Sequence, residues 1–242
     1  MYNTLVMGTL YIVATPIGNL NDISLRVVDT IMNADFIACE DTRKTGLLLK
    51  YIEEKFFEKP PKKPLFFSYY EQNEQRRIPE IIKLLKEGKN IVLASDAGTP
   101  TISDPGYKLV REVIKEGLLV VSIPGPSSII SALVSSGLPT DKFVFYGFPP
   151  HKKGHRVKMF KNISLLNKTM KLTIIFFEAP HKLINTLKEM QNEFGDIYIV
   201  IARELTKKFE EIRREKINES INHFSKTKPK GEITILFRLE SL

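Results

Sequence analysis

Carboxylates stand at two points of the sequence where they can serve proton transfer. Glu40 and Asp41 directly follow a short apolar segment, and Arg43 stands two residues further on. Glu178 follows the strongly apolar residues 174–177. A carboxylate at the end of a buried strand can act as a general base, so Glu178, Glu40 and Asp41 are our candidate proton acceptors. Two alternatives remain open: Glu178 caps the helix that follows it, and Arg43 pairs with its acidic neighbours at the surface.

A loop rich in glycine and proline spans residues 96–106 and is typical of a ligand-binding segment. Its glycines, Gly98 among them, permit backbone conformations that other residues resist, and its prolines stiffen the chain. Such a loop presents amide and carbonyl groups to a small polar ligand, while Asp96 or Asp104 can contact a ligand amine or a ribose hydroxyl. An irregular connection with ordinary turn residues is the alternative, but a loop of this composition and length is more often functional.

Two serines are predicted at the start of a helix. Residues 124–128 form a proline- and glycine-containing turn that leads into an apolar segment, which places Ser127 or Ser128 at the helix N-terminus. The free backbone amides there suit a carboxylate or a phosphate. An ordinary N-cap serine explains the same residues equally well.

The elements that position these residues belong to a predicted α/β fold. The first half alternates short apolar runs with helical patterns, as parallel βαβ units do. We predict strands at residues 9–14, 36–39, 65–69, 90–94 and 118–123, and helices at 24–34, 42–51, 74–87 and 107–115. Ligands of an open parallel sheet bind beyond the carboxyl ends of its strands. The segments rich in glycine, proline and carboxylates follow four of these strands, which predicts a site at that edge.

The second half contains more strands and fewer helices, which predicts a mixed α/β domain with a mixed sheet. We expect strands at residues 142–147, 173–177, 197–202, 211–216 and 233–239, and helices at 129–135, 155–166 and 181–194. A proline- and glycine-rich turn joins the halves. We therefore predict two domains, residues 1–121 and 122–242.

The positive charge of the chain lies entirely in its second half. The chain has 242 residues and a formal net charge of +8. Residues 1–121 contain 16 basic and 16 acidic side chains, whereas residues 122–242 contain 20 and 12. Residues 142–177 contain no acidic side chain at all. A surface that binds a polyanion and a merely solvated lysine-rich face both explain this distribution.

Several classes of protein are excluded or disfavoured by what the sequence lacks. A single cysteine, Cys39, excludes a disulfide within the chain and argues against a cysteine-based metal site. We see no secretory signal and no apolar run long enough to cross a bilayer, so we expect a cytoplasmic protein that binds neither membrane nor metal. The usual dinucleotide, P-loop and serine-hydrolase motifs are missing from the sequence.

Ten segments, in order along residues 10–237, resemble those of one family. They are TPIGNLND (15–22), CEDTR (39–43), SDAGTP (95–100), ISDPG (102–106), PGPS (124–127), SGLP (136–139), GFPP (147–150), EAPH (178–181), RELTK (203–207) and KGE (230–232). The chain resembles the ribosomal small subunit methyltransferase I family, which makes 2′-O-methylcytidine in 16S rRNA. That family belongs to the tetrapyrrole-methylase superfamily of S-adenosylmethionine enzymes.

The resemblance implies a tetrapyrrole-methylase-like fold of two α/β domains with the cofactor in the cleft between them, and a homodimer. By position, it implies that S-adenosylmethionine contacts Pro16, Gly98, Pro100, Ile102, Ser127, Ser128, Phe177, Leu205 and Gly231, to which the loop analysis adds Asp96. Lys182 stands where the family usually has arginine, which removes a bidentate contact there. Many members continue past the final strand, so we expect RNA contacts of such a segment to be absent or supplied elsewhere.

The expected reaction is direct in-line transfer of the sulfonium methyl group to a ribose 2′-oxygen, without a metal. The enzyme holds the oxygen in line and a carboxylate removes its proton. Asp22 and Glu204 stand in reserve behind the three candidate acceptors. We expect the small-subunit rRNA to contact exposed basic side chains at Arg43, Lys152, Lys153, Arg156 and Lys158. The rivals are a methyltransferase of the same architecture acting on a tetrapyrrole precursor and a non-enzymatic rRNA-binding assembly factor.

Overall fold

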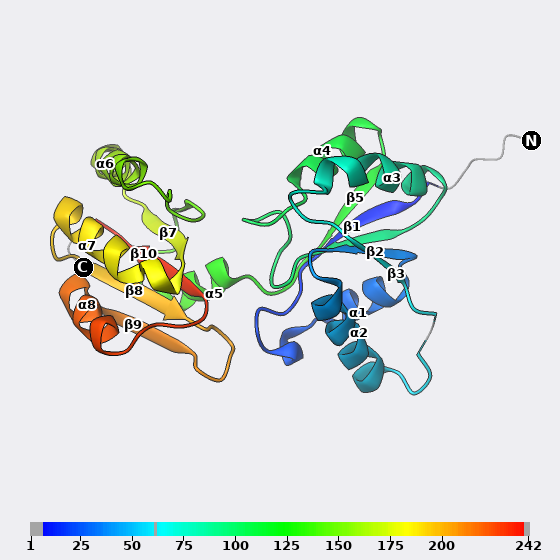
Figure 1. Cartoon of the computed structure of the whole chain (residues 1–242), viewed down its shortest axis with the longest axis horizontal. Coiled ribbons are helices and arrows are strands. Elements are labelled where there is room, and N and C mark those ends of the chain that lie inside the picture. The colour runs from blue at the N-terminus through cyan, green and yellow to red at the C-terminus, as the bar shows by residue number, and fades with distance from the viewer. Residues whose placement is uncertain (1–6, 61, 240–242) are drawn as a thin grey trace, which may run out of the picture. The chain divides into compact units, whose positions relative to one another are not determined.

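The computed structural model describes residues 7–60 and 62–239, which form two compact units (Figure 1). The first unit ends at Ser127 and the second begins at Ser128. Strand β5 (Leu119–Ile123) pairs with β1 (Thr9–Val13) along its whole length, up to the pair of Ile123 with Val13. The division therefore falls beyond β5, whereas the sequence predicts a boundary between residues 121 and 122, within that strand.

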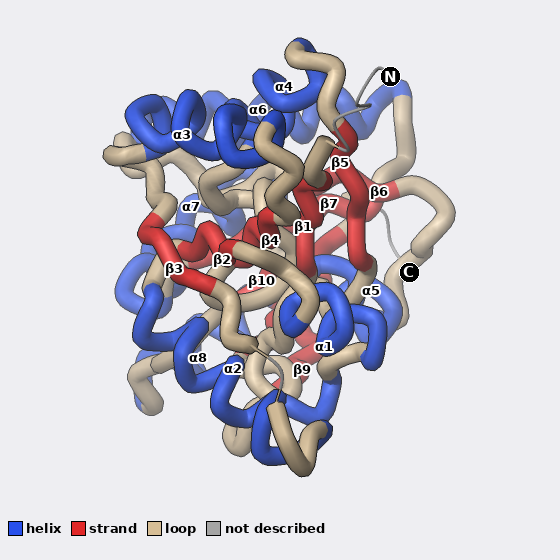
Figure 2. The backbone as a smooth tube through the Cα atoms, turned by 90° about the vertical axis from the view of Figure 1, so that its right-hand side faces the viewer, coloured by secondary structure: helices blue, strands red, loops and turns tan. Residues whose placement is uncertain are grey.

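The first unit contains a parallel five-stranded sheet with the strand order β3-β2-β4-β1-β5. Its remaining strands are β2 (Phe36–Cys39), β3 (Leu65–Ser68) and β4 (Ile91–Ala94). Helices α1 (Leu25–Met32) and α2 (Thr42–Phe56) cover one face, and α3 (Glu74–Lys86) and α4 (Tyr107–Lys115) cover the other (Figure 2). Because both faces are covered, every residue of β4 is buried.

Local sequence explains where the helices next to the predicted site begin. The Ser24 side chain accepts a hydrogen bond from the amide of Val27 at 3.2 Å and caps α1. Asp41 caps α2 in the same way through the amide of Arg43, at 2.9 Å. Helix α2 continues to Phe56, past the end predicted at residue 51, because its buried face extends to the fully buried Ile52.

The second unit contains a mixed sheet with the strand order β6-β7-β10-β8-β9, in which only β6 and β7 are parallel. The strands are β6 (Phe143–Phe145), β7 (Thr173–Glu178), β8 (Tyr198–Arg203), β9 (Glu211–Lys216) and β10 (Ile233–Phe237). Helices α6 (Lys153–Thr169), α7 (Leu183–Phe194) and α8 (Ile217–Lys226) share one core with the sheet, and α5 (Ser128–Ser136) contacts β8 and β10. The predicted α/β class, with a parallel first sheet and a mixed second sheet, is confirmed.

Two short 3-10 helices complete the elements, η1 (Leu20–Asp22) and η2 (Pro180–Lys182). Among the α-helices and strands of the described residues, the sequence prediction missed only α8. Its buried residues Ile217, Ser220 and Phe224 have helical spacing, but Ser220 interrupts the apolar stripe. The packing of Phe224 against the second core therefore decides the helix more than the local pattern does.

Candidate functional site

The carboxyl ends of all five strands of the first sheet meet at one edge because the strands are parallel. The loops that leave this edge contain the motifs at residues 14–18, 40–43, 95–106 and 124–127. The prediction that these segments gather at one edge is confirmed by the strand order. Three of the loops, after β1, β4 and β5, leave neighbouring strands.

Hydrogen bonds join these three loops to one another. The amide of Thr15 donates to the carbonyl of Gly98 at 2.8 Å, and the amide of Gly98 returns a bond of 3.0 Å. The Thr99 hydroxyl donates to the carbonyl of Pro126 at 3.3 Å. Gly98 has a φ of +82°, and a Cβ there would lie 3.3 Å from Cγ2 of Ile17. The junction therefore requires glycine at residue 98.

The other predicted cofactor contacts of the first unit differ in exposure. Pro16 and Pro100 are buried, whereas Ile102 is 44% exposed. Ser127 ends the first unit, and Ser128 begins α5, which confirms that these serines stand at a helix start. The junction thus combines a buried frame with an apolar side chain that is open to a ligand.

Strained backbone is concentrated in two of the motif loops. Four non-glycine residues in the described part of the chain have a left-handed φ: Thr101 (+74°), Ser103 (+63°), Glu204 (+52°) and Thr206 (+66°). The first two belong to the loop at residues 95–106, and the other two follow β8. Such conformations cost free energy and cluster at ligand-binding and active sites. Their positions support a functional role for both loops.

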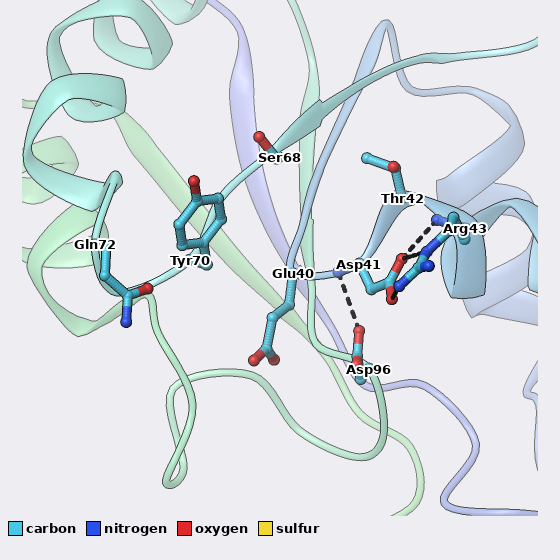
Figure 3. A pocket seen from close by; sticks show the side chains of 8 residues that line it. All are labelled: Glu40, Asp41, Thr42, Arg43, Ser68, Tyr70, Gln72 and Asp96. Carbon is cyan, nitrogen blue, oxygen red and sulfur yellow. Dashed lines mark hydrogen bonds and ion pairs between the residues drawn. The ribbon is translucent and has the colours of Figure 1, made fainter.

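A pocket of about 470 Å³ lies over the carboxyl ends of β2, β3 and β4 (Figure 3). Its lining residues are Glu40, Asp41, Thr42, Arg43, Ser68, Tyr70, Gln72 and Asp96. Sequence analysis missed the three that follow or end β3, namely Ser68, Tyr70 and Gln72. These three residues lie at the carboxyl end of a predicted parallel strand, and this position is the sequence signal that could have identified them. We call this the acidic pocket.

The three carboxylates of the acidic pocket are in different states. Arg43 holds Asp41 through two contacts, Nε to Oδ1 at 3.1 Å and Nη2 to Oδ2 at 2.8 Å, and these bonds keep the pKa of Asp41 well below its usual range. Asp96 accepts hydrogen bonds from the amide of Asp41 at 3.1 Å and from Nζ of Lys44 at 2.6 Å. The carboxylate of Asp96 is thus bound to the segment after β2.

Glu40 is the carboxylate that stays available. Its side chain accepts no hydrogen bond and makes no ion pair with any residue that the structure describes. Partial desolvation raises the pKa of Glu40, and the negative charge of Asp96 raises that pKa further. In Figure 3 the Glu40 carboxylate extends into the space between Gln72 and Asp96. A free carboxylate with a raised pKa is suited to accept a proton.

Glu178 lies in a different environment, at the end of β7. Its side chain is buried, with 4% exposure. Oε1 accepts a hydrogen bond from the amide of Ala179 at 2.8 Å, and Oε2 accepts one from the hydroxyl of Thr186 on α7. Both oxygens therefore tie β7 to the segment after it, but neither η2 nor α7 has a side-chain cap hydrogen bond, so the capping alternative is not borne out. The role of Glu178 as proton acceptor stays a prediction.

Besides Ser128, three of the predicted cofactor contacts lie in the second unit, and these three gather at one edge of its sheet. Phe177, Leu205 and Gly231 stand near the ends of β7 and β8 and the start of β10, where Ile233 pairs with both Glu178 and Arg203. The half-buried ring of Phe177 lies 4.8 Å from that of Phe145.

Gly231 is required because a side chain there would displace Glu204. Gly231 has a φ of +86°, and a Cβ there would lie 2.2 Å from Cδ of Glu204. Glu204 Oε1 in turn accepts hydrogen bonds from Nζ of Lys207 at 2.9 Å and from the amide of Glu232 at 3.1 Å. Of the two reserve acceptors, Glu204 is thus engaged within its loop, and Asp22 is exposed in η1.

The basic residues predicted to contact RNA are not all exposed. Lys152, Lys153 and Lys158 are exposed, and so is Arg43 despite its pair with Asp41. Arg156 is buried, at 8% exposure, and the expectation that it is exposed is wrong.

Arg156 is buried because it bonds to α7 and to the segment that precedes α6. Its Nη2 donates to Oε1 of Glu189 at 2.7 Å, and its Nη1 donates to the carbonyls of Pro150 at 3.0 Å and His151 at 3.2 Å. Residues 142–177 are also not one surface. Lys142 stands at the amino end of β6, where its carbonyl accepts from the amide of Thr173, opposite the end that leads to Lys152.

Arg156→Ala is expected to destabilise the protein by about 3 kcal/mol, because it leaves the nearly buried carboxylate of Glu189 without its partner. Urea unfolding measures this loss. Lys158→Ala, two residues further along the same helix and exposed, is the matched control and is expected to change the free energy of unfolding by less than about 0.5 kcal/mol. Equal stability of the two variants would contradict the assignment of Arg156 as a structural residue.

Two searches of residues 7–60 and 62–239 have negative results. No group of three or more His, Cys, Asp or Glu side chains there is arranged to hold a metal ion. No helix in this part of the chain is both long and apolar enough to cross a membrane.

Comparisons with known proteins agree on one family. Residues 9–220 match the model for tetrapyrrole (corrin/porphyrin) methylases. The chain is 46% identical over 230 residues to ribosomal RNA small subunit methyltransferase I of Thermotoga maritima, covering 95% of this chain and 98% of that protein. It is 43% identical to the protein of the same name from Halalkalibacterium halodurans, covering 95% of this chain and 75% of the relative. The fold is similar to that of uroporphyrin-III-C-methyltransferase from Thermus thermophilus, with a TM-score of 0.63, 16% identity and coverage of 96% and 95%.

Proposed function

Because the chain belongs to the ribosomal RNA small subunit methyltransferase I family of tetrapyrrole methylases, we propose that it methylates the 2′-oxygen of a cytidine ribose in 16S rRNA, with S-adenosylmethionine as donor. The structural observation that carries this proposal is the free carboxylate of Glu40 in the acidic pocket, which is also lined by Asp96 of the strained loop at residues 95–106. The resemblance also supports a homodimer in the cytoplasm.

The residues of the first unit suit a cofactor with an adenine, a ribose, an amine and a carboxylate. The junction of the loops around Gly98 offers backbone amides and carbonyls, and the exposed Ile102 offers an apolar surface for a ring. Ser127 and Ser128 place a helix N-terminus at the end of the same segment, which suits a carboxylate. When bound, S-adenosylmethionine supplies a methyl group that is already activated on its sulfonium.

The chain then has two tasks, to hold the acceptor ribose and to take its proton. We assign the acidic pocket to the target nucleoside, with the exposed ring of Tyr70 as a surface on which a base stacks. Glu40 accepts the proton of the 2′-hydroxyl as the oxygen attacks. Arg43 and Asp41 form an ion pair at the rim. Asp41 and Glu178 remain the alternative acceptors.

The proposal predicts a pH dependence that Glu40 sets. The deprotonated carboxylate is the active form, and its raised pKa places the acidic limb of the single-turnover rate at a higher pH than an ordinary glutamate would. The rate therefore rises with pH through this pKa and then levels. Asp96→Asn removes the negative charge that raises the pKa, so the limb is expected to move to lower pH at saturating cofactor. If the acidic limb of the Asp96→Asn pH–rate profile stays at the same pH or moves to higher pH, the role of Glu40 is contradicted.

The function itself is tested with two measurements on the wild-type protein. Calorimetry is expected to show binding of S-adenosylmethionine. Small ribosomal subunits from a strain lacking the modification are expected to accept labelled methyl groups from the protein, while a tetrapyrrole precursor is not. No cofactor binding would favour an assembly factor, and transfer to the tetrapyrrole alone would favour the other rival.

A further inference from the structure

One end of the second sheet carries a basic surface beside the predicted cofactor contacts Leu205 and Gly231. It consists of residues 147–153, 204–210 and 227–232, which leave β6 and β8 and precede β10. The pairs of Ile233 with Glu178 and Arg203 bring these strand ends together. We call this surface the basic edge. Its five exposed lysines are Lys152, Lys153, Lys208, Lys228 and Lys230.

The acidic residues of the basic edge do not neutralise these lysines. Glu204 and Glu232 both pair with Lys207, at 2.9 Å each. Glu210 accepts a hydrogen bond from the amide of Thr206. Within the described residues, none of the five lysines forms a salt bridge. The edge therefore keeps a positive field that attracts a polyanion.

Two exposed phenylalanines stand among these lysines. Phe209 is 66% exposed at the turn between β8 and β9, with Nζ of Lys208 5.7 Å from its ring centroid. Phe148 is 56% exposed in the first segment, and its ring lies 5.5 Å from that of Phe177. Exposed aromatic rings beside cationic side chains are the combination that binds single-stranded nucleic acid, because every base has a face that can stack.

We propose that the basic edge binds an unpaired segment of ribosomal RNA, with Phe148 and Phe209 stacked on bases and the five lysines at phosphates. A base-paired segment would leave the rings without partners, because its bases are already stacked on one another. The inference rests on the proposed function, since it identifies the RNA as the polyanion. It adds Phe148, Phe209, Lys208, Lys228 and Lys230 to the residues that contact the substrate.

The first test measures binding of an unstructured, fluorescently labelled oligoribonucleotide. Phe209→Ala is expected to weaken binding about tenfold, as loss of one stacked base does, and Phe209→Trp is expected to restore it. Phe143→Ala is the matched control, because Phe143 is 42% exposed at the opposite end of the same sheet and is expected to leave binding unchanged. A duplex of the same sequence is expected to bind Phe209→Ala as well as it binds the wild type.

The lysines are tested through salt. Each phosphate contact that is lost lowers the slope of log affinity against log salt by about 0.7 for a single strand. The triple variant Lys208→Ala, Lys228→Ala, Lys230→Ala is therefore expected to have weaker binding and a flatter slope than the wild type, with unchanged affinity for S-adenosylmethionine. A wild-type protein that does not bind the oligoribonucleotide, or variants that bind it with wild-type affinity and slope, would overturn the proposal.

Methylation of small subunits separates this inference from the proposed function. Wild-type transfer to rRNA together with an unchanged rate for Phe209→Ala at subsaturating subunits would overturn only the basic edge. No transfer by the wild type despite binding of the cofactor would overturn the proposed function itself, and the basic edge as an rRNA surface with it. The expected result is transfer by the wild type, a lower subsaturating rate for Phe209→Ala, and recovery with Phe209→Trp.

Discussion

Replacing Glu40 by glutamine is expected to slow methyl transfer by about 10²-fold or more, while the fold and the affinity for S-adenosylmethionine are retained. Glutamine keeps the shape of the side chain but cannot accept the proton of the ribose hydroxyl. The fold is expected to survive because the Glu40 carboxylate makes no hydrogen bond with the described residues that would be lost. Single-turnover transfer to small subunits and calorimetry with the cofactor measure the two quantities.

Two matched variants locate the proton acceptor. Asp41→Asn removes a carboxylate that already pairs with Arg43, and Glu178→Gln removes one that binds Thr186 and Ala179. Both substitutions are expected to lower the free energy of unfolding. The methylation rate per folded molecule is expected to change little. An unchanged rate for Glu40→Gln, with a large loss for one of the other two, would transfer the role to that residue.

Replacing Gly98 by valine is expected to abolish binding of S-adenosylmethionine. The left-handed backbone at this residue costs a β-branched side chain about 1–3 kcal/mol. Its Cβ would also press on Ile17, because only 3.3 Å separates them. To relieve that contact, the backbone at residue 98 must shift and disturb its hydrogen bonds with Thr15. The loops that carry the proposed cofactor contacts then shift as well.

Gly117→Val is the control for this variant. Gly117 also has a left-handed φ, +69°, but a Cβ there has no neighbour within 4 Å. The control therefore has a similar backbone cost without disturbance of the junction, and it is expected to bind the cofactor normally. If Gly98→Val does not fold, Gly98→Ala gives the same comparison with a smaller side chain. A folded Gly98 variant with wild-type cofactor affinity would place the cofactor elsewhere.

Sequence patterns predicted most of the fold because glycines and changes in local composition mark the ends of many helices and strands. Helix α4 begins after Gly106 and ends before Gly117, and both of its bounds were predicted. Strands β2 and β9 also have their predicted bounds. The end of α2 was missed because charged residues there resemble a loop, while Ile52 packs into the core.

The site was less predictable because its chemistry depends on contacts between distant residues. The parallel strands of the first sheet are enough to predict at which edge the site lies and which loops meet there. The strand order does not show which carboxylate stays free. That depends on two contacts, the bond of Lys44 to Asp96 and the bond of Thr186 to Glu178. The burial of Arg156 likewise depends on Glu189, on another helix. No local pattern contains these pairings.

The most direct test of the central claim is the identity of the methylated nucleoside. Small subunits that lack the modification are incubated with the protein and S-adenosylmethionine labelled in its methyl group, and the rRNA is digested to nucleosides for mass spectrometry. We predict labelled 2′-O-methylcytidine for the wild type and a loss of at least about 10²-fold for Glu40→Gln. A label on a base, on another nucleoside, or absent from the rRNA would contradict the account.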